Sequence, residues 1–328
     1  MQTAFLTAKG VILKNINMRS PDINEVKLKV DACGICGTDL HEREIKGEEG
    51  FGHEIAGTII ETGAAVSFKK GTKVALDSAS PCGICENCHN GRQELCTQIK
   101  SIWFCGTFGF AEQVLAPKES VLPYEGLDPA VACLQEPLGV AIDMVRLADI
   151  NIESNVIISG GGPIGLMALA LVRKAGARRV FVIQPKRRKA RVKVASLFGA
   201  DAIIEPEEIA KYNFGCQIDR ILITSSPRTM PALFSIATKG AIISFIGIDH
   251  GSGAYCNFNV NDFHFKKLQL RASFASPALF GPMALKFLKE KIVDGEALIS
   301  HRLPLKEIAK ALEIAKKEPD AIKVVILP

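Results

Sequence analysis

The stretch NVIISGGGPIG, residues 155–165, decides the fold that this chain can adopt. Its first five residues are an apolar run of strand length, and an apolar stretch of helical length, residues 163–175, follows the first glycines. Between strand and helix, G-x-G-x-x-G is typical of a turn whose free N–H groups hold the pyrophosphate of a dinucleotide. We therefore expect a dinucleotide to contact Gly160, Gly161, Gly162, Pro163, Ile164 and Gly165.

The residues that follow repeat this alternation of strand and helix. Apolar runs of strand length occur at 180–183, 218–223 and 241–246, and a helix is expected at 186–198. Strands that alternate with helices indicate a parallel, doubly wound sheet with right-handed crossovers. This part of the chain is therefore predicted to be an α/β domain.

The chain before residue 137 has a different character. Short segments of alternating apolar and polar residues, separated by Gly and Pro, predict a β-rich, barrel-like domain with strands at 26–30, 55–61 and 111–116. Near the end of the chain we expect two helices and a strand, at 278–289, 305–316 and 323–327.

Composition and charge restrict the class of protein. A chain of 328 residues favours two domains, and 48% hydrophobic residues with a net charge of only +5 favour a globular protein over a nucleic-acid binder. We identify no secretory signal, and the longest apolar stretch, residues 160–172, is too short to span a bilayer. We therefore expect a cytoplasmic protein that binds neither nucleic acid nor membrane. Its ten cysteines should be thiols, metal ligands or catalysts rather than disulfides.

Four of the cysteines form a compact C-x2-C-x2-C-x7-C array, made of Cys82, Cys85, Cys88 and Cys96. Four thiolates at this spacing can surround one zinc ion and leave no coordination position open, which predicts a structural zinc. An iron–sulfur cluster is a weaker alternative, because ferredoxin-type runs place the fourth cysteine three residues on rather than seven. His89 lies inside the loop and could compete as a ligand.

A second group of metal-binding residue types is less compact. Cys36 and His53 suit zinc, the carboxylate of Glu54 is adjacent, and Glu136 lies at the expected domain junction. Three or four such ligands and one exchangeable water would make a catalytic zinc site. Taken alone, each residue has an ordinary interpretation, since a single Cys is usually a small buried hydrophobe and a single Glu a solvated charge.

Together, these motifs resemble the zinc-containing medium-chain dehydrogenases, the family of alcohol, sorbitol and threonine dehydrogenases. The run GICGTDLH, residues 34–41, and the four-cysteine array occur in the family's order, and the resemblance covers essentially the whole chain. The family signature G-H-E-x2-G-x5-G-x2-V is matched by Gly52, His53, Glu54, Gly57, Gly63 and Val66.

The resemblance implies an α/β fold with a doubly wound parallel Rossmann sheet and a β-rich, GroES-like (barrel-like) catalytic domain that carries a structural zinc lobe. We expect the catalytic domain at 1–137 with its lobe at 82–96, the Rossmann domain at 138–272, and a return segment completing the catalytic domain at 273–328. The two independent ligand sets predict two zinc ions per chain, and we expect a homo-oligomer, either a dimer or a tetramer.

For the open metal site, the resemblance implies that Cys36, His53 and Glu136 form the catalytic zinc shell, with Glu54 as an alternate or transient ligand. Asp39 would orient His53. A Glu-Pro pair at residues 136–137 is similar to the polyol and threonine dehydrogenase branch rather than to the liver-type alcohol dehydrogenases.

The implied reaction is hydride transfer between NAD(P) and a secondary alcohol of a polyol, sugar or related hydroxy compound, which becomes a ketone. Thr38 and His41 match the family's proton relay, although His41 could also be a plain surface histidine. Two other classes are disfavoured by the intact ligand set: a nucleotide-binding relative without turnover, and a zinc-stabilised nucleic-acid-binding protein.

The cofactor preference depends on the residue that ends the second strand of the dinucleotide-binding domain. An acidic residue normally binds the ribose there, but this chain has Gln184, followed by Lys186, Arg187 and Arg188. Loss of the carboxylate and gain of cations suit the 2′-phosphate of NADP, with NAD as the alternative. A solvated basic helix face is the other interpretation of this run.

Overall fold

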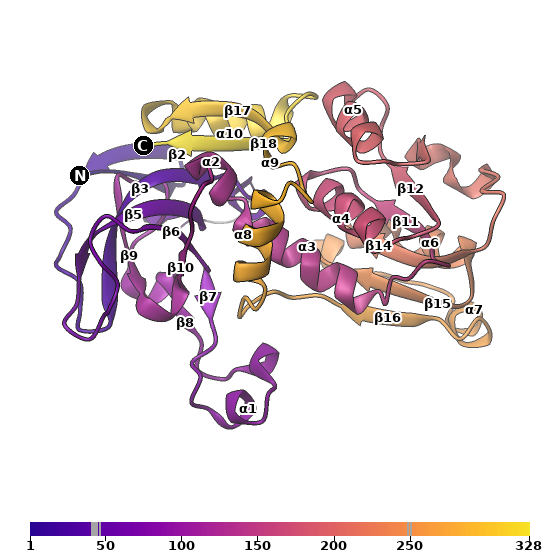
Figure 1. Cartoon of the computed structure of the whole chain (residues 1–328). Helices are drawn as coiled ribbons and strands as arrows, with labels where there is room; N and C mark the ends of the chain where they lie inside the picture. Colours follow the sequence, from indigo (N-terminus) through magenta and orange to yellow (C-terminus); the bar gives the residue numbers. More distant parts are fainter. Residues whose placement is uncertain (41–44, 46, 248, 250) are drawn as a thin grey trace. The chain divides into compact units, whose positions relative to one another are not determined.

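The computed structural model describes residues 1–40, 45, 47–247, 249 and 251–328. The chain forms two compact units, shown in Figure 1: unit 1 is residues 1–139 with 275–328, and unit 2 is residues 140–274. The expected combination of a β-rich domain with a doubly wound parallel sheet is confirmed. Within the described ranges, every helix is too short or too polar to cross a lipid bilayer.

Unit 1 consists mainly of short strands. They are β1 (Gln2–Thr7), β2 (Gly10–Asn15), β3 (Glu25–Gly34), β4 (Glu49–Gly50), β5 (Glu54–Thr62), β6 (Lys73–Leu76), β7 (Ala79–Ser80), β8 (Lys100–Ser101), β9 (Gln113–Pro117), β10 (Val121–Pro123), β17 (Ile299–Pro304) and β18 (Lys323–Leu327). Its helices are α1 (Glu86–His89), α2 (Pro129–Ala132), α8 (Gly281–Lys289), α9 (Gly295–Leu298) and α10 (Ile308–Lys317), and α3 (Gln135–Leu147) leads from unit 1 into unit 2.

The main sheet of unit 1 has the order β10-β6-β5-β3-β18-β17, and β9 also pairs with β3. In β3 the side chains of Val26, Leu28 and Val30 are buried at every second position, as a half-buried strand requires. Strand β18 pairs antiparallel with β3 and parallel with β17. Figure 1 shows these yellow strands beside the indigo ones. Residues from both ends of the chain therefore share one sheet and one core.

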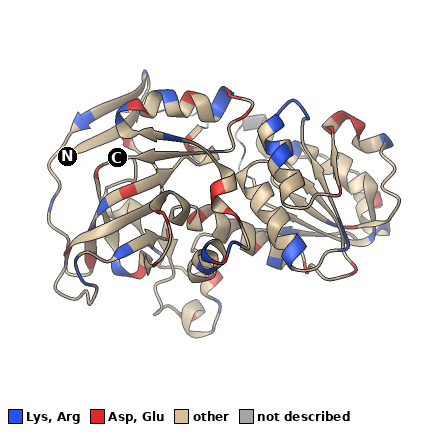
Figure 2. Cartoon of the chain, turned by 45° about the horizontal axis from the view of Figure 1, so that its top comes forward, with Lys and Arg blue, Asp and Glu red and all other residues tan. Residues whose placement is uncertain are grey.

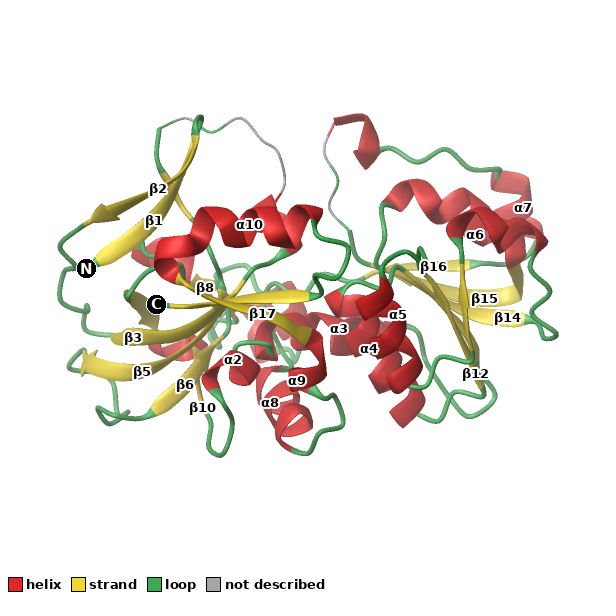
Figure 3. Cartoon of the chain, turned by 90° about the horizontal axis from the view of Figure 1, so that it is seen from above, coloured by secondary structure: helices red, strands yellow, loops and turns green. Residues whose placement is uncertain are grey.

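Unit 2 contains a fully parallel sheet. Its strands are β11 (Asn155–Ser159), β12 (Arg179–Ile183), β13 (Ala202–Ile204), β14 (Ile218–Ile223), β15 (Ala237–Phe245) and β16 (Gln269–Ala272), and its other helices are α4 (Pro163–Lys174), α5 (Lys189–Leu197), α6 (Met230–Ile236) and α7 (Val260–Phe265). The strand order is β13-β12-β11-β14-β15-β16. Figure 3 shows α4 and α5 on one face of the sheet and α6 and α7 on the other, the doubly wound arrangement. In Figure 2 the charged positions of this unit gather on helices and loops, while the strands are mostly tan.

Three expected helices begin later than the sequence pattern suggests. The helix expected from residue 186 begins at Lys189, because the N–H of Arg188 bonds to the carbonyl of Pro185 and closes a turn there. The helix expected from residue 278 begins at Gly281, which places Pro282 in the first turn, where its missing N–H does no harm. The third begins as a 3-10 turn at residues 305–307 and becomes α-helical at Ile308.

Candidate zinc sites and nucleotide-binding turn

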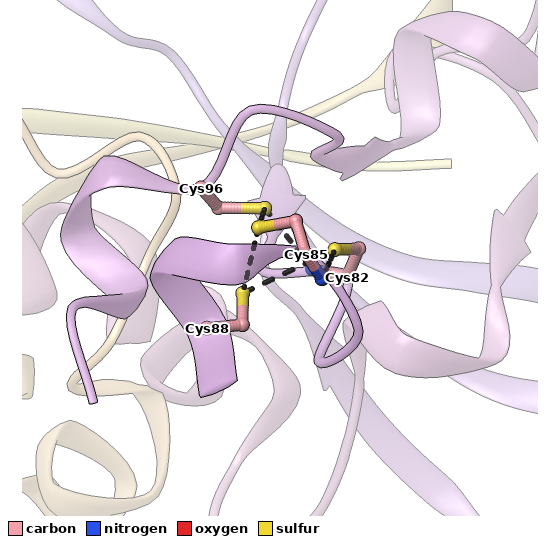
Figure 4. A group of neighbouring side chains, drawn as sticks. All are labelled: Cys82, Cys85, Cys88 and Cys96. Atoms are coloured by element: carbon pink, nitrogen blue, oxygen red, sulfur yellow. Dashed lines mark hydrogen bonds between the residues drawn. The ribbon is translucent and has the colours of Figure 1, made fainter. Parts of the chain in front are cut away.

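The four cysteines predicted to form a structural zinc site lie together in the loop between β7 and β8. Figure 4 shows their side chains converging from both sides of α1. We call residues 82–96 the cysteine lobe. Two sulfur pairs, Cys85–Cys88 and Cys85–Cys96, are 3.5 and 3.9 Å apart, and the Sγ atoms of Cys82 and Cys88 are 4.0 Å apart. A tetrahedron of sulfurs about 2.3 Å from a central zinc has edges of roughly 3.8 Å, so this array fits one zinc ion.

Backbone N–H groups prepare the cysteine lobe for thiolates. The N–H groups of Ile84 and Cys85 donate to Cys82 Sγ at 3.4 and 3.3 Å, and the N–H of Cys82 donates to Cys96 Sγ at 3.3 Å. Hydrogen bonds from the backbone of Cys88 and Thr97 lower the pKa of the Cys85 thiol to about 5. The thiolate form of Cys85 is therefore favoured, whereas burial and the neighbouring thiols raise the pKa of Cys88 to about 12.

The second ligand group is assembled on the main sheet of unit 1. Cys36 follows β3, while His53 and Glu54 lie at the start of β5, the neighbouring strand. One ligand atom from each of the three residues lies within 4.8 Å of the other two. We call this group the open site. It combines sulfur, imidazole and carboxylate donors, which suits zinc with a position left for substrate.

His53 is surrounded by negatively charged groups. Burial alone would lower its pKa, but a hydrogen bond with Cys36 and the charges of Glu136 and Asp39 raise the pKa of His53 well above its usual value. Asp39 accepts the N–H of Cys36 at 2.9 Å and has an oxygen 3.9 Å from His53 Nδ1. This excess of negative charge would also attract a metal cation.

Glu54 is buried and has a cationic partner that the sequence analysis did not single out. Lys323 of β18 places its Nζ 2.5 Å from each carboxylate oxygen and donates to Oε1. A Cβ atom at Gly34 would lie 2.1 Å from Glu54 Oε2, so only glycine leaves room for this carboxylate. The signal available in the sequence was a single lysine in the otherwise apolar strand KVVIL.

Glu136, at the start of α3, is close to the open site but outside the three-residue cluster. Ser78 donates to its Oε1 at 3.3 Å. The residues just before Ser78 and Glu136 are also hydrogen-bonded to each other: Gln135 Nε2 donates to Asp77 Oδ1 at 2.6 Å. Two consecutive residues after β6 thus hold two consecutive residues of α3, which fixes the position of Glu136.

Thr38 and an aromatic side chain lie near the residues of the open site. Thr38 is exposed on a 3-10 turn, residues 37–40, and His41 lies outside the described residues. The indole of Trp103 lies 5.8 Å from the imidazole of His53, centroid to centroid, and is 46% exposed. The sequence analysis did not identify Trp103, since no local pattern links residue 103 to residue 53.

The glycine turn of unit 2 connects β11 to α4 as predicted. Gly160 has φ of +107°, and a Cβ at Gly165 would lie 1.8 Å from the carbonyl oxygen of Gly160, so both positions require glycine. Gly162 is the N-cap of α4, provides no side-chain cap, and a Cβ there would meet nothing within 4 Å. The start of the helix is therefore open to an anionic ligand.

The residues that follow β12, which were predicted to select the cofactor, differ in their exposure and in their partners. Gln184 is only 3% exposed and accepts the N–H of Gly161 at 3.0 Å, so its amide folds back on the glycine turn. The Nζ of Lys186 lies 3.5 Å from a carboxylate oxygen of Glu208. Arg187 is exposed and Arg188 is half-buried, in the turn that precedes α5.

Comparisons with known proteins show which family the chain is similar to. Residues 22–126 match the family model of the alcohol dehydrogenase GroES-like domain, and residues 163–290 match that of the zinc-binding dehydrogenases. The chain is 31% identical to an L-threonine 3-dehydrogenase of Bacillus velezensis, over 98% of this chain and 96% of that protein.

Two further relatives cover nearly the whole chain. An L-galactonate-5-dehydrogenase of Escherichia coli is 28% identical, over 93% of this chain and 92% of the relative. The crystal structure of a zinc-binding dehydrogenase of Sinorhizobium meliloti bound to NADP is similar with a TM-score of 0.88 and 27% identity, covering 100% of this chain and 99% of that one.

Proposed function

The chain belongs to the zinc-dependent medium-chain alcohol dehydrogenase family, and from this premise we propose which residues carry out its reaction. It is an NAD(P)-dependent zinc oxidoreductase that transfers a hydride between the nicotinamide and the carbon of an alcohol. We propose that the substrate is a secondary alcohol of a polyol, a sugar or a related hydroxy compound. The relatives named for L-threonine and L-galactonate support this class.

The observation that carries the proposal is the convergence of Cys36, His53 and Glu54 within 4.8 Å. We propose that these residues hold the catalytic zinc and that Glu136, fixed by Ser78, is a further ligand. When bound there, zinc supplies a Lewis acid for the oxygen of the alcohol. Asp39 faces His53 Nδ1 and so leaves Nε2 for the metal.

We propose that the hydroxyl of Thr38 accepts the proton of the alcohol. Its exposed position beside Asp39 supports this role, because a relay residue needs both the substrate and solvent within reach. His41 is the proposed next member of the relay. Binding of the pyrophosphate is assigned to the glycine turn and the open start of α4.

The direct test is turnover of a panel of secondary alcohols with NAD and with NADP, followed by the absorbance of the reduced nicotinamide. We expect at least one polyol or sugar derivative to be oxidised by the wild type and none by Cys36→Ala. A zinc-loaded chain that binds the cofactor and oxidises none of the panel would instead be a nucleotide-binding relative without turnover.

We further propose two zinc ions per chain, one in the open site and one in the cysteine lobe. The fit of both donor sets supports this number. Elemental analysis of protein prepared without chelator should give two equivalents of zinc, and one equivalent in Cys36→Ala. One equivalent or fewer in the wild type would reject the number.

We propose a preference for NADP over NAD. No carboxylate ends β12, since Gln184 is neutral and turned toward Gly161, and Arg187 and Arg188 lie in the turn that follows. Guanidinium groups suit a phosphate through paired charge-assisted hydrogen bonds. The NADP complex of the relative from Sinorhizobium meliloti also supports this preference.

The preference is tested by steady-state kinetics on the double variant Arg187→Ala with Arg188→Ala. We expect the Michaelis constant for NADP to rise by about tenfold, because this is the effect of losing one charge-assisted hydrogen bond. The Michaelis constant for NAD should stay the same. Lys186→Ala is the matched control, because it removes one cation of the same segment, whose Nζ lies 3.5 Å from Glu208. A wild type with a higher specificity constant for NAD would refute the proposal.

We also propose a homo-oligomer that works in a reducing compartment such as the cytoplasm. The outer strand of the unit 2 sheet, β16, has a partner on one side only, and its Leu270 is 37% exposed. An uncovered strand edge of this kind commonly pairs with another chain. Light scattering should give a mass of two or four chains.

A further inference from the structure

A buried ion pair adjoins the open site. Lys323 is 2% exposed and Glu54 is 0% exposed, and the Nζ of Lys323 lies 2.5 Å from the carboxylate. The same Nζ donates to the carbonyl oxygen of Ile35, at 2.9 Å. The lysine thus reaches from β18 into the segment that connects β3 to Cys36.

The surrounding structure leaves this pair little freedom. The absence of a side chain at Gly34 leaves room for the pair in this position, since a Cβ there would lie 2.1 Å from Glu54 Oε2 and 3.1 Å from the Cε of Lys323. Gly34 itself is held by β18, opposite Val325. Charges buried this deeply are costly unless they are paired, so both groups depend on partners inside the protein.

The Glu54 carboxylate also belongs to the metal-binding cluster. One of its oxygens lies within 4.8 Å of the ligand atoms of Cys36 and His53. Both of its buried oxygens lie 2.5 Å from the Nζ of Lys323, which donates to Oε1. The same carboxylate can therefore interact with two cations, the ammonium group of Lys323 and the metal.

We propose that Lys323 is a positioning residue of the zinc site, which shares the Glu54 carboxylate with the metal and keeps Glu54 a weak, exchangeable zinc ligand. This inference rests on the proposed zinc site of Cys36, His53 and Glu54. Without the ammonium group, the carboxylate has only the metal as a partner and binds it more tightly. The coordination position that the substrate needs is then occupied more of the time.

A merely structural ion pair would give the opposite result. If Lys323 only neutralised a buried charge, its loss would loosen this part of unit 1 and release zinc faster. The direction of the change in the zinc dissociation rate therefore separates the two roles.

The experiment measures zinc transfer from the zinc-loaded protein to a chromogenic chelator. Lys323→Met, which keeps the length of the side chain, should release the open-site zinc about tenfold more slowly than the wild type, the scale on which groups behind metal ligands act. Its kcat should fall, while the Michaelis constant for the cofactor stays the same. Lys323→Arg is the matched control, because it keeps the charge and should restore the wild-type rate.

Glu54→Gln provides the second comparison. In that background Lys323→Met should leave the zinc release rate unchanged, since the shared carboxylate is gone. If Lys323→Met does not fold, Lys323→Gln should shift the rate in the same direction by a smaller factor. Zinc release that is unchanged or faster in the foldable neutral variant would overturn the inference.

Failure of the proposed zinc site gives a distinct result. In that case Cys36→Ala would contain as much zinc as the wild type, and no release phase would depend on Cys36. If that phase is present but neutral substitutions of Lys323 do not slow it, only the role of Lys323 is refuted.

Discussion

The cysteine lobe and the open site lie in the same unit but are built in opposite ways. All four sulfurs of the lobe come from residues 82–96, and those of Cys82 and Cys96 accept N–H groups of the same loop. The open site takes its donors from the end of β3 and the start of β5, and its supporting groups from β18 and the residues after β6. The lobe is thus built by one local loop, whereas the open site depends on segments that only the folded sheet brings together.

The largest expected effect of this difference is on catalysis. Cys36→Ala should lower kcat by about 1000-fold, because it removes a ligand of the proposed Lewis acid. The thermal midpoint should change little, because the main sheet and its core do not depend on the metal. Activity assays and calorimetry on the same preparation check both statements, and a large fall in the midpoint would remove the distinction between the sites.

The corresponding change in the lobe should affect stability. Cys85→Ala should destabilise the chain by several kcal/mol or make it insoluble, because metal binding at a closed site is coupled to folding. Urea unfolding measures the difference. The control is Cys216→Ala, which changes a cysteine of unit 2 remote in sequence from both ligand sets. Equal stability of Cys85→Ala and the wild type would contradict the structural role.

Chelation tests the same contrast without mutation. With excess chelator, we expect zinc to leave in two phases, the first at least about tenfold faster than the second, because a site with an exchangeable position admits the chelator. Activity should disappear with the first phase, and structure with the second. If activity and structure were lost in the same phase, the chelator would reach the two sites equally easily.

The smallest effect concerns the support of the open site. Burial raises the pKa of Asp77 to about 7, although the hydrogen bond from Gln135 opposes this. The folded state therefore favours the neutral carboxyl of Asp77. The contribution of this group to the free energy of unfolding is complete below the unfolded-state pKa of about 4, and it is lost as the pH rises through 7. Between pH 5 and 8 the wild type should lose about 2 kcal/mol relative to Asp77→Asn, measured by urea unfolding. Parallel pH profiles would contradict this.

The sequence was most informative where function depends on neighbouring residues. The strands β11, β12, β14 and β15, the helices α4 and α5, the glycine turn and the four-cysteine array could be predicted, since each follows from local spacing. The short elements β13, β16, α6 and α7 were not predicted. The start of α5 was placed three residues too early, because the turn at Pro185 and Arg188 is set by a backbone hydrogen bond rather than by residue type. Lys323 and Glu54 are 269 residues apart, and the pairing of β3 with both β18 and β5 brings them together.

Trp103, the ring beside His53, is the only tryptophan in the chain. All tryptophan fluorescence of the protein therefore originates about one ring diameter from the open site, and none comes from the cysteine lobe. A paramagnetic ion such as cobalt bound in the open site should therefore quench this emission. The tryptophan thus provides an optical signal for metal exchange at the proposed catalytic site.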